Sequence, residues 1–324
     1  MIDYGITFVT VVLMYALLAQ GLNLHWGYAG LYNIGIAAFF AIGGYTAALI
    51  SSPGPNLAVR DDFVWAGDLA AVFRQVPLIG SLEIWFVIAI CGAAVVGGLF
   101  ALPIGFMTLR LRGDYLAIAT LGVTEVARAV ILNERWLTNG SKGLYKVPQV
   151  FPSILPPADY EKIYLVVVFV VVLVIGMAIK KMMDSPWARA LSAFRDNAVG
   201  VESAGIDTRK LQLQVFVIGA AIMSLAGALF AFDLRAISPN GYTHLAGTFL
   251  IWVMLMVGGS GRFWGPFLGA GVVWAVWSWS QFAPGWFSSA DARFVIIGLL
   301  LICVQLLAPK GIGGFLSRKK TRGN

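Results

Sequence analysis

The chain has 324 residues, of which 59% are hydrophobic and only 12% are charged. Soluble globular proteins contain about 45–50% apolar and about 25% charged residues, so this composition excludes a water-soluble protein, and it excludes disordered, collagen-like and disulfide-scaffold chains as well. In a soluble protein a net charge of +7 would suggest nucleic-acid binding, but in a membrane protein it indicates cationic cytoplasmic loops.

The predicted elements are membrane-spanning helices, each of which needs about 20 mostly apolar residues to cross about 30 Å of hydrocarbon. The first apolar stretch lacks the basic residues and the small-residue cleavage site of a signal peptide, so we expect it to be retained as a helix. We predict an all-α, polytopic transmembrane helical bundle of about nine spans (eight to ten), forming a single domain over residues 1–324. In chain order the predicted spans cover about 4–24, 30–50, 84–109, 115–133, 163–183, 212–233, 246–259, 266–283 and 292–309.

The segments 246–259 and 266–283 are the least regular of the predicted spans. Both are short and they flank a glycine-rich turn, which leaves open whether they cross the membrane or form a re-entrant pair inside a protein-lined cavity.

Lysine and arginine are distributed unevenly between the two sets of loops that nine spans create. Fourteen of these residues fall on the side of the C-terminus and eight on the opposite side. Because cytoplasmic loops carry an excess of basic residues, we expect the C-terminus inside the cell and the N-terminus outside. The long outer loops, 51–83 and 134–162, contain Pro and Gly and should be irregular or form short surface helices. The inner side holds the loop 184–211 and a basic tail, 310–324.

The inner loop contains a predicted short amphipathic helix. Ser185 can cap this helix, and Pro186 suits its first position. Apolar residues at helical spacing then form one stripe, made of Trp187, Leu191, Phe194 and Ala198. Physical chemistry alone leaves open whether the stripe lies on the lipid surface or docks into a groove of a soluble partner.

No residue pattern in the sequence predicts catalysis. The phosphate-binding loop G-x-x-x-x-G-K-[ST] is absent, so any ATP must be hydrolysed by another chain. Gly258-Gly259-Ser260-Gly261 matches a short pattern of rhomboid-type serine proteases, but such a serine needs a base, and both histidines, His25 and His244, precede it. Two histidines without an H-E-x-x-H pattern also argue against a metal site. We therefore expect neither an enzyme nor a bound cofactor.

Glu125 and Arg128 are ionisable residues inside a predicted span. They lie three residues apart and so share a helix face. A charged side chain in hydrocarbon costs about 2.5–3.5 kcal/mol on insertion scales unless it is paired or faces a wet cavity. The pair is therefore interpreted either as part of a helix that lines a transport path or as a structural ion pair that ties helices together.

Two stripes of small residues at four-residue spacing predict close helix packing. The two stripes are Gly261, Gly265 and Gly269, and Ala220, Ser224 and Ala228. The glycine stripe can also border a pore.

Cys91 and Cys303 lie in apolar runs, and we expect both to be buried without forming a disulfide.

Five stretches, in order from about residue 15 to 310, resemble the permease subunits of branched-chain amino-acid ABC importers, and within that family the LivM-like type. The segment 185–191 (SPWARAL), continued to Gly205-Ile206, is similar to the family's "SP-x-G-R-A-L…A-x-x-LGI". The segment 138–144 (TNGSKGL) is similar to its outer "TGGSNGL". The other matching stretches are GLNL at 21–24 with GYAGL at 27–31, LRLRGDY at 109–115 with TLG at 120–122, and GGSG at 258–261 with WGPFLGA at 264–270.

The resemblance implies one subunit of a larger assembly in the bacterial cell (inner) membrane. The family pairs two permeases with two ATP-binding cassette ATPases and a soluble substrate-binding protein. The loop 184–211 is then the coupling loop, whose helix docks on an ATPase, and the tail 310–324 is cytoplasmic. The residues expected to couple to the ATPase are Trp187, Arg189, Leu191, Phe194 and Arg195.

The function implied by the resemblance is inward transport of branched-chain or other hydrophobic amino acids by alternating access. The family often has Ser-Leu-Gly-His where this chain has Asn33-Ile34-Gly35-Ile36, and relatives also carry urea and short amides. The alternative from a different functional class is a self-sufficient secondary carrier or channel, which needs no ATPase. The residues expected to line the substrate path are Asn33, Thr120, Thr124 and Glu125.

Overall fold

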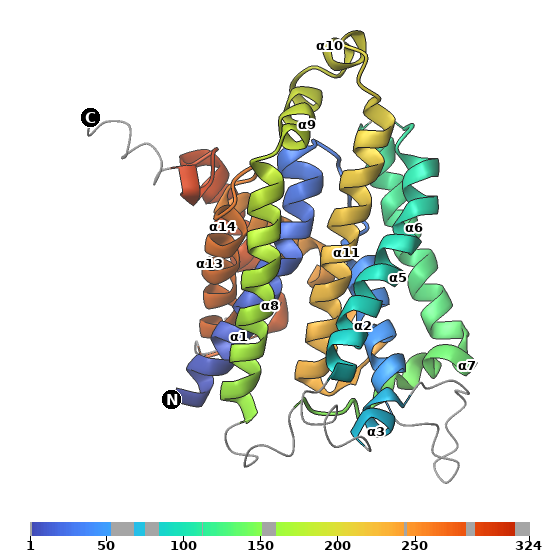
Figure 1. The fold of residues 1–324 in the computed structure, drawn as a ribbon. Coiled ribbons are helices and arrows are strands. Elements are labelled where there is room, and N and C mark those ends of the chain that lie inside the picture. Colours follow the sequence, from blue (N-terminus) through green and yellow to red (C-terminus); the bar gives the residue numbers. More distant parts are fainter. Residues whose placement is uncertain are drawn as a thin grey trace.

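The computed structural model describes residues 2–52, 68–74, 84–111, 113–150, 160–242, 245–282 and 289–314. Each of the nine predicted spans contains a helix, and the helices stand side by side in one bundle (Figure 1). They are α1 (Ile2–Leu22) with a π-helical extension (Asn23–Tyr28), α2 (Ile36–Ser51), α5 (Ile84–Thr108), α6 (Gly113–Asn133), α8 (Tyr160–Met183), α11 (Thr208–Leu234), α12 (Leu250–Gly258) after a π-helix (Leu245–Phe249), α13 (Gly265–Ser280) and α14 (Ala290–Leu307).

Six helices in the described part of the chain are long and apolar enough to cross a membrane. The remaining helices of the nine, α2, α12 and α13, are apolar but shorter. The chain is thus an all-α, multi-pass membrane protein, as its composition predicts. The six long helices are α1, α5, α6, α8, α11 and α14.

The core of the bundle forms where α11 packs against α1, α2 and α5. Ser224 Oγ in α11 donates a hydrogen bond of 2.8 Å to the main-chain oxygen of Phe39 in α2. A side chain at Gly43 would overlap the main chain of Ser224, and one at Gly97 would overlap its side chain, so glycine allows both α2 and α5 to approach α11 closely. This confirms the packing predicted from the stripe Ala220, Ser224 and Ala228.

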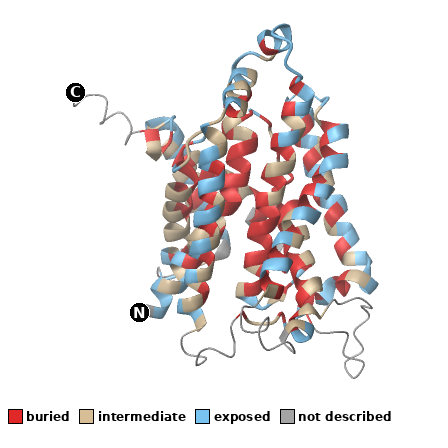
Figure 2. Cartoon of the chain, viewed as in Figure 1, coloured by how far each residue is buried: buried red, intermediate tan, exposed pale blue. Residues whose placement is uncertain are grey.

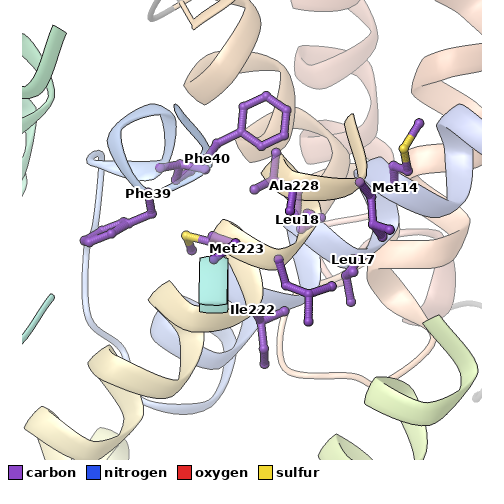
Figure 3. Packing of buried hydrophobic residues seen from close by; sticks show 14 of the residues in the cluster. Met14, Leu17, Leu18, Phe39, Phe40, Ile222, Met223 and Ala228 are labelled. Carbon is purple, nitrogen blue, oxygen red and sulfur yellow. The ribbon is translucent and has the colours of Figure 1, made fainter. Parts of the chain in front are cut away.

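Large side chains fill the space around this contact. Figure 3 shows residues of α1, α2 and α11 pointing toward one another, and α11 is the most deeply buried of the long helices (Figure 2). The labelled members of this cluster, none more than 8% exposed, are Met14, Leu17, Leu18, Phe39, Phe40, Ile222, Met223 and Ala228.

The helices α12 and α13 form a close antiparallel pair. Side chains at Gly265 or Gly269 would overlap the main chain of α12 or of Gly259 at its end, which confirms the packing interpretation of the glycine stripe for these two residues. The third, Gly261, instead lies against Gly27 and Arg195. α13 begins near the end of α12. Gln281 directly follows α13, and its Nε2 lies 3.5 Å from the hydroxyl oxygen of Tyr4 at the opposite end of the bundle. α13 therefore runs the length of the bundle. Seven of the nine α12 residues are buried, so protein surrounds this short helix.

The bundle has two distinct ends. One end carries α9 (Pro186–Asp196) and α10 (Ala198–Ser203), and the C-terminal described residues lie at this end too, because Arg262 Nη1 there donates to Lys310 O at 2.9 Å. α1 starts at the opposite end (Figure 1), as an odd number of crossings requires. That end also carries α3 (Leu69–Arg74), α7 (Arg135–Thr138), 3₁₀ turns (Gly140–Lys142, Pro239–Tyr242) and a two-residue antiparallel pair of β1 (Leu144–Tyr145) with β2 (Ala236–Ile237).

The described parts of the outer loops therefore consist of short helices, turns, irregular stretches and the two-residue strand β1. The predicted short surface helices are present, and the strand was not predicted. The rest of these loops (53–67, 75–83 and 151–159), Arg112, His244 and residues 315–324 of the basic tail lie outside the described residues.

The expectation that the cysteines are buried is wrong. Cys91 in α5 and Cys303 in α14 are both exposed at the outer surface of the bundle, and both are free thiols. In a membrane-spanning helix the outward face is as apolar as the inward face, so an apolar run does not indicate which side meets the core.

Candidate functional site

The chain loses regular structure within the bundle at residues 29–35, between the π-helical end of α1 and the start of α2. We call this stretch the unwound segment. Its polar main-chain atoms bond to other parts of the protein: Ile34 N donates to Thr120 Oγ1 at 3.0 Å, and Ile34 O accepts from Thr248 Oγ1 at 3.3 Å. Non-helical backbone at membrane depth is tolerated only with such partners, and it is typical of helices that are broken at a transport site.

A buried polar pair, His25 and Asn33, holds the unwound segment against α11. His25 Nε2 lies 2.9 Å from Phe216 O, and its Nδ1 lies 3.0 Å from Asn33 Nδ2. A main-chain oxygen can only accept, so Nε2 carries the proton and Nδ1 accepts from the amide of Asn33. Asn33 Oδ1 in turn accepts from Gly35 N at 2.7 Å. Both side chains are fully buried, and their polar groups are used within the protein.

A second polar contact joins the end of α1 to the turn between α12 and α13. Gln20 Nε2 donates to Phe263 O at 2.6 Å, and Asn23 Nδ2 donates to Arg262 O at 3.0 Å. Asn23 Oδ1 accepts from Gly261 N at 2.8 Å. Gln20 and Asn23 are fully buried, so these bonds fix the turn to the π-helix that precedes the unwound segment.

An apolar cavity of about 460 Å³ opens beside the unwound segment. Its size lies within the range of ligand pockets, about 300–1,000 Å³. We call it the aromatic groove. Four parts of the chain line it, namely the unwound segment, α6, the π-helix with α12, and α14. Its lining residues are Tyr32, Ile34, Leu121, Thr248, Phe249, Trp252, Val253, Met256, Leu301 and Gln305.

The aromatic wall of the groove is attached to the unwound segment. The ring centroids of Tyr32 and Trp252 lie 4.9 Å apart with the planes at 89°, and Trp26 packs edge-on against Trp252 at 5.5 Å. Trp252 Nε1 donates to Asn33 O at 3.2 Å. Trp252 of α12 is thus held to the unwound segment by both a ring contact and a hydrogen bond. The side chains of Thr248 and Gln305 supply polar groups to a lining that is otherwise largely apolar.

None of the four residues predicted to line the path lines this groove. Asn33, Thr120 and Thr124 are buried and bond within the protein, and they hold the unwound segment and α6 in place. Glu125 is exposed on the outer face of α6, and Arg128 is half-buried. Direct contact of the four with a substrate thus stays a prediction. Ile36, at the position where the family often has histidine, is fully buried and is also absent from the lining.

The groove residues were missed because they come from segments far apart in the sequence. One of them, Gln305, carries a usable signal, since a polar residue inside an apolar span is costly in lipid unless it faces protein or a cavity. The aromatic residues carried none, because Tyr32 and Trp252 do not differ in type or spacing from the many aromatics that pack elsewhere in the bundle.

The predicted amphipathic helix exists as α9, and its apolar stripe packs largely against the protein's own bundle. Leu191 is fully buried, while Trp187 and Phe194 are partly buried against the core. Trp187 Nε1 donates to Gln214 Oε1 of α11 at 2.9 Å. These three side chains therefore position the helix. Arg189 lies on its exposed face.

Two details of the predicted helix are wrong. Ser185 makes no side-chain cap; its hydroxyl donates to Met182 O at 2.6 Å, back into the preceding helix. Ala198 is not part of the stripe, because Asn197 adopts an extended conformation that ends α9 and caps α10. Val199 in α10 is 72% exposed and extends the outer surface of this loop.

Arg195 connects α9 to the end of α1. Its Nη1 donates a hydrogen bond of 2.5 Å to the main-chain oxygen of Gly27, and its side chain pairs with Asp196 at 3.2 Å. Gly30 and Gly261 leave room for the arginine, since a Cβ atom at Gly30 would lie 2.9 Å from its Cγ and one at Gly261 would lie 3.4 Å from Nη1. The loop at this end is thus joined to the polypeptide just before the unwound segment.

The serine of the Gly258–Gly261 pattern lies in the turn between α12 and α13. Both ring nitrogens of His25 are taken by Phe216 and Asn33, so this histidine is not available as a base for Ser260. His244 lies outside the described residues. In the part of the chain that the structure describes, no cluster of potential metal ligands occurs.

Comparison with known proteins places these features in one family. The family described as "Branched-chain amino acid transport system / permease component" matches residues 5–305. No solved structure matches the chain.

Three relatives illustrate the similarity. The high-affinity branched-chain amino acid transport system permease protein LivM of Escherichia coli K12 is 29% identical over 277 residues, which cover 78% of this chain and 58% of that protein. The probable branched-chain amino acid transport permease protein LivM of Methanocaldococcus jannaschii is 26% identical over 92% of this chain and 90% of its own length. The corresponding permease protein LivH of Salmonella typhimurium is 26% identical over 94% of this chain and 93% of its own length.

Proposed function

Because the chain belongs to the family of branched-chain amino acid transport system permease components, we propose that it is the membrane-spanning permease subunit of an ATP-driven (ABC) importer for branched-chain or other hydrophobic amino acids. The observation that carries this proposal is the family match over residues 5–305, nearly the whole length of the bundle. The partners are a second permease, two ATP-binding cassette ATPases that hydrolyse the ATP, and a soluble substrate-binding protein. The chain itself performs no covalent chemistry.

The protein lies in the bacterial cell (inner) membrane with the α9 end on the cytoplasmic side. Fourteen of the lysines and arginines in the sequence fall on this side against eight on the other, which supports the orientation. The C-terminus is then cytoplasmic and the N-terminus external.

The aromatic groove forms one wall of the substrate path, and the second permease closes it. Tyr32, Phe249 and Trp252 suit an aliphatic side chain, because its transfer from water to an apolar surface lowers the free energy. Gln305 offers hydrogen bonds to the charged main-chain groups of an amino acid, and the Thr248 oxygen, whose hydrogen is donated to Ile34 O, can accept one from the ammonium group. This balance of apolar and polar lining favours hydrophobic amino acids over urea or short amides.

Coupling runs from the loop 184–211 to the groove through covalent and hydrogen-bonded contacts. The exposed faces of α9 and α10, which include Arg189 and Val199, meet the ATPase. Closure of the ATPases displaces α9, and Arg195 passes the displacement to Gly27 and the unwound segment. The groove then alternates between two states of different substrate affinity, which alternating access requires.

Co-purification from native membranes in mild detergent, with mass spectrometry of the bound chains, tests the proposal. We expect two ATPase chains and a second, different permease. A solitary protein under several detergents, with uptake that follows an ion gradient, would instead indicate a secondary carrier.

A further inference from the structure

A second cavity, of about 280 Å³, lies at the α9 end between the last turn of α5 and the first turn of α11. It shares no lining residue with the aromatic groove. Three of its lining residues belong to the loop 184–211, but the coupling contacts proposed above involve α9, α10 and Arg195, none of which lines the cavity. Its lining residues are Gly105, Phe106, Leu109, Arg110, Asp207, Arg209, Lys210 and Leu213.

The polar side of this cavity carries a net positive charge. Arg110, Arg209 and Lys210 supply three cations, and all three are exposed. Asp207 is the acidic residue of the lining, and its carboxylate caps α11 by accepting from Lys210 N at 3.1 Å. The N-terminus of α11, a helix of 27 residues, adds partial positive charge at the same place. The cavity therefore selects an anion.

The other side of the cavity is apolar and continues along the membrane-spanning face of α5. Phe106 and Leu109 line the cavity, and the guanidinium of Arg110 lies 5.2 Å from the centroid of the Phe106 ring. Leu99, Leu102 and Phe106 follow at spacings of three and four residues, and they are 59%, 40% and 65% exposed. They form an outward apolar strip that leads from the cationic mouth into the hydrocarbon region.

We propose that this cavity binds an anionic phospholipid, with its phosphate at Arg110, Arg209 and Lys210 and an acyl chain along Leu99, Leu102 and Phe106. A basic pocket between membrane-spanning helices at the lipid boundary recognises an anionic headgroup through charge. The adjoining apolar strip provides a surface for an acyl chain. A free anion or an acidic soluble protein has no acyl chain and would leave this strip unused. The inference is independent of the transport function.

Native mass spectrometry of the full-length protein in nanodiscs tests this directly. The discs contain phosphatidylcholine with a minor fraction of phosphatidylglycerol, and the bound phosphatidylglycerol is titrated. One variant combines Arg110→Gln, Arg209→Gln and Lys210→Gln. A matched control combines Lys180→Gln, Lys181→Gln and Lys310→Gln, which removes three exposed basic residues from the same end but outside the cavity.

We expect the wild type and the control to retain one tightly held phosphatidylglycerol and the cavity variant to bind it on the order of a hundredfold more weakly, about fivefold for each charge removed. Glycerol phosphate and inorganic phosphate should not displace the lipid. Equal losses in the cavity variant and the control would overturn the proposal, because they would indicate non-specific attraction to a basic surface. Displacement by inorganic phosphate would identify a free-anion site. Unchanged phosphatidylglycerol binding in the cavity variant would also overturn it, because the three cations would then not hold the headgroup.

The apolar half of the site has its own test. Phe106→Ser should weaken the binding of long-chain phosphatidylglycerol while leaving the unfolding temperature in pure phosphatidylcholine unchanged, since Phe106 is 65% exposed. Unchanged lipid binding in this variant would contradict the acyl-chain assignment.

Discussion

Arg195 Nη1 and the main-chain oxygen of Gly27 are joined by a hydrogen bond of 2.5 Å that links residues 168 positions apart. The bond runs from the last turn of α9 to the π-helical end of α1, directly before the unwound segment. That segment carries Tyr32, which packs against Trp252 in the wall of the aromatic groove. One contact therefore connects the loop proposed to meet the ATPase with the wall proposed to meet the substrate.

Replacing Arg195 by glutamine should uncouple these two regions. A hydrogen bond from a charged donor contributes about 1.5–3 kcal/mol, so we expect uptake to fall about tenfold or more while the complex still assembles and hydrolyses ATP. The measurement compares ATP hydrolysis with substrate uptake in proteoliposomes. Lys180→Gln, at an exposed site in the last turn of α8, serves as the control. A parallel loss of assembly would place Arg195 in the ATPase contact instead.

Phe194 and Val199 should respond differently to aspartate. Phe194 packs against the bundle, so Phe194→Asp should loosen α9 and reduce uptake while ATPase chains remain bound. Val199 is 72% exposed, so Val199→Asp should weaken the retention of the ATPase without lowering the unfolding temperature. Pull-down of the ATPase and thermal unfolding of both variants separate the two roles. Full transport by both variants would contradict a coupling role for this loop.

Gln305 should contribute to transport through the groove. Loss of one neutral hydrogen bond costs about 0.5–1.5 kcal/mol, so Gln305→Ala should lower maximal uptake about 2–10-fold. The KM for the loaded binding protein should not change, because that protein docks on the opposite side of the membrane. Gln281→Ala, another exposed glutamine outside the groove, is the matched control. Equal effects of the two substitutions would remove the support for a polar role of the groove.

Gly43→Ala should destabilise the bundle. The added methyl group would overlap the main chain of Ser224, and overpacking of this kind costs about 1–3 kcal/mol. In Gly298→Ala, by contrast, the new Cβ atom meets nothing within 4 Å, so the unfolding temperature should stay unchanged. Thermal unfolding in detergent compares the two, and an equal response would show that α2 and α11 are less closely packed than described.

The sequence predicts the helices well because a membrane span must be long and apolar, a property that is local to each segment. The nine predicted spans all contain helices, and most of their ends agree within a few residues. The largest difference is at α2, which was predicted from residue 30 and begins at Ile36. The irregular backbone before it is stabilised by hydrogen bonds to Thr120 and Thr248. These residues are remote in sequence, and no local pattern predicts the bonds.

The candidate site was predictable only in part. The amphipathic stripe correctly indicated α9, but periodicity alone does not tell whether a stripe faces lipid, a partner or the chain's own bundle, and Leu191 proved to be internal. The family resemblance predicts a coupling role for Arg195, whereas its bond to Gly27 depends on tertiary packing that no pattern along the chain indicates. The groove combines side chains from four separate segments, so its position follows from tertiary packing and not from spacing along the chain.

Uptake of radiolabelled leucine into proteoliposomes that contain the purified complex tests the proposed function most directly. With loaded binding protein outside and ATP inside, we predict accumulation that stops when the ATPase is inhibited and that does not change when ion gradients are dissipated. Accumulation that persists without ATP and follows an ion gradient would contradict the account.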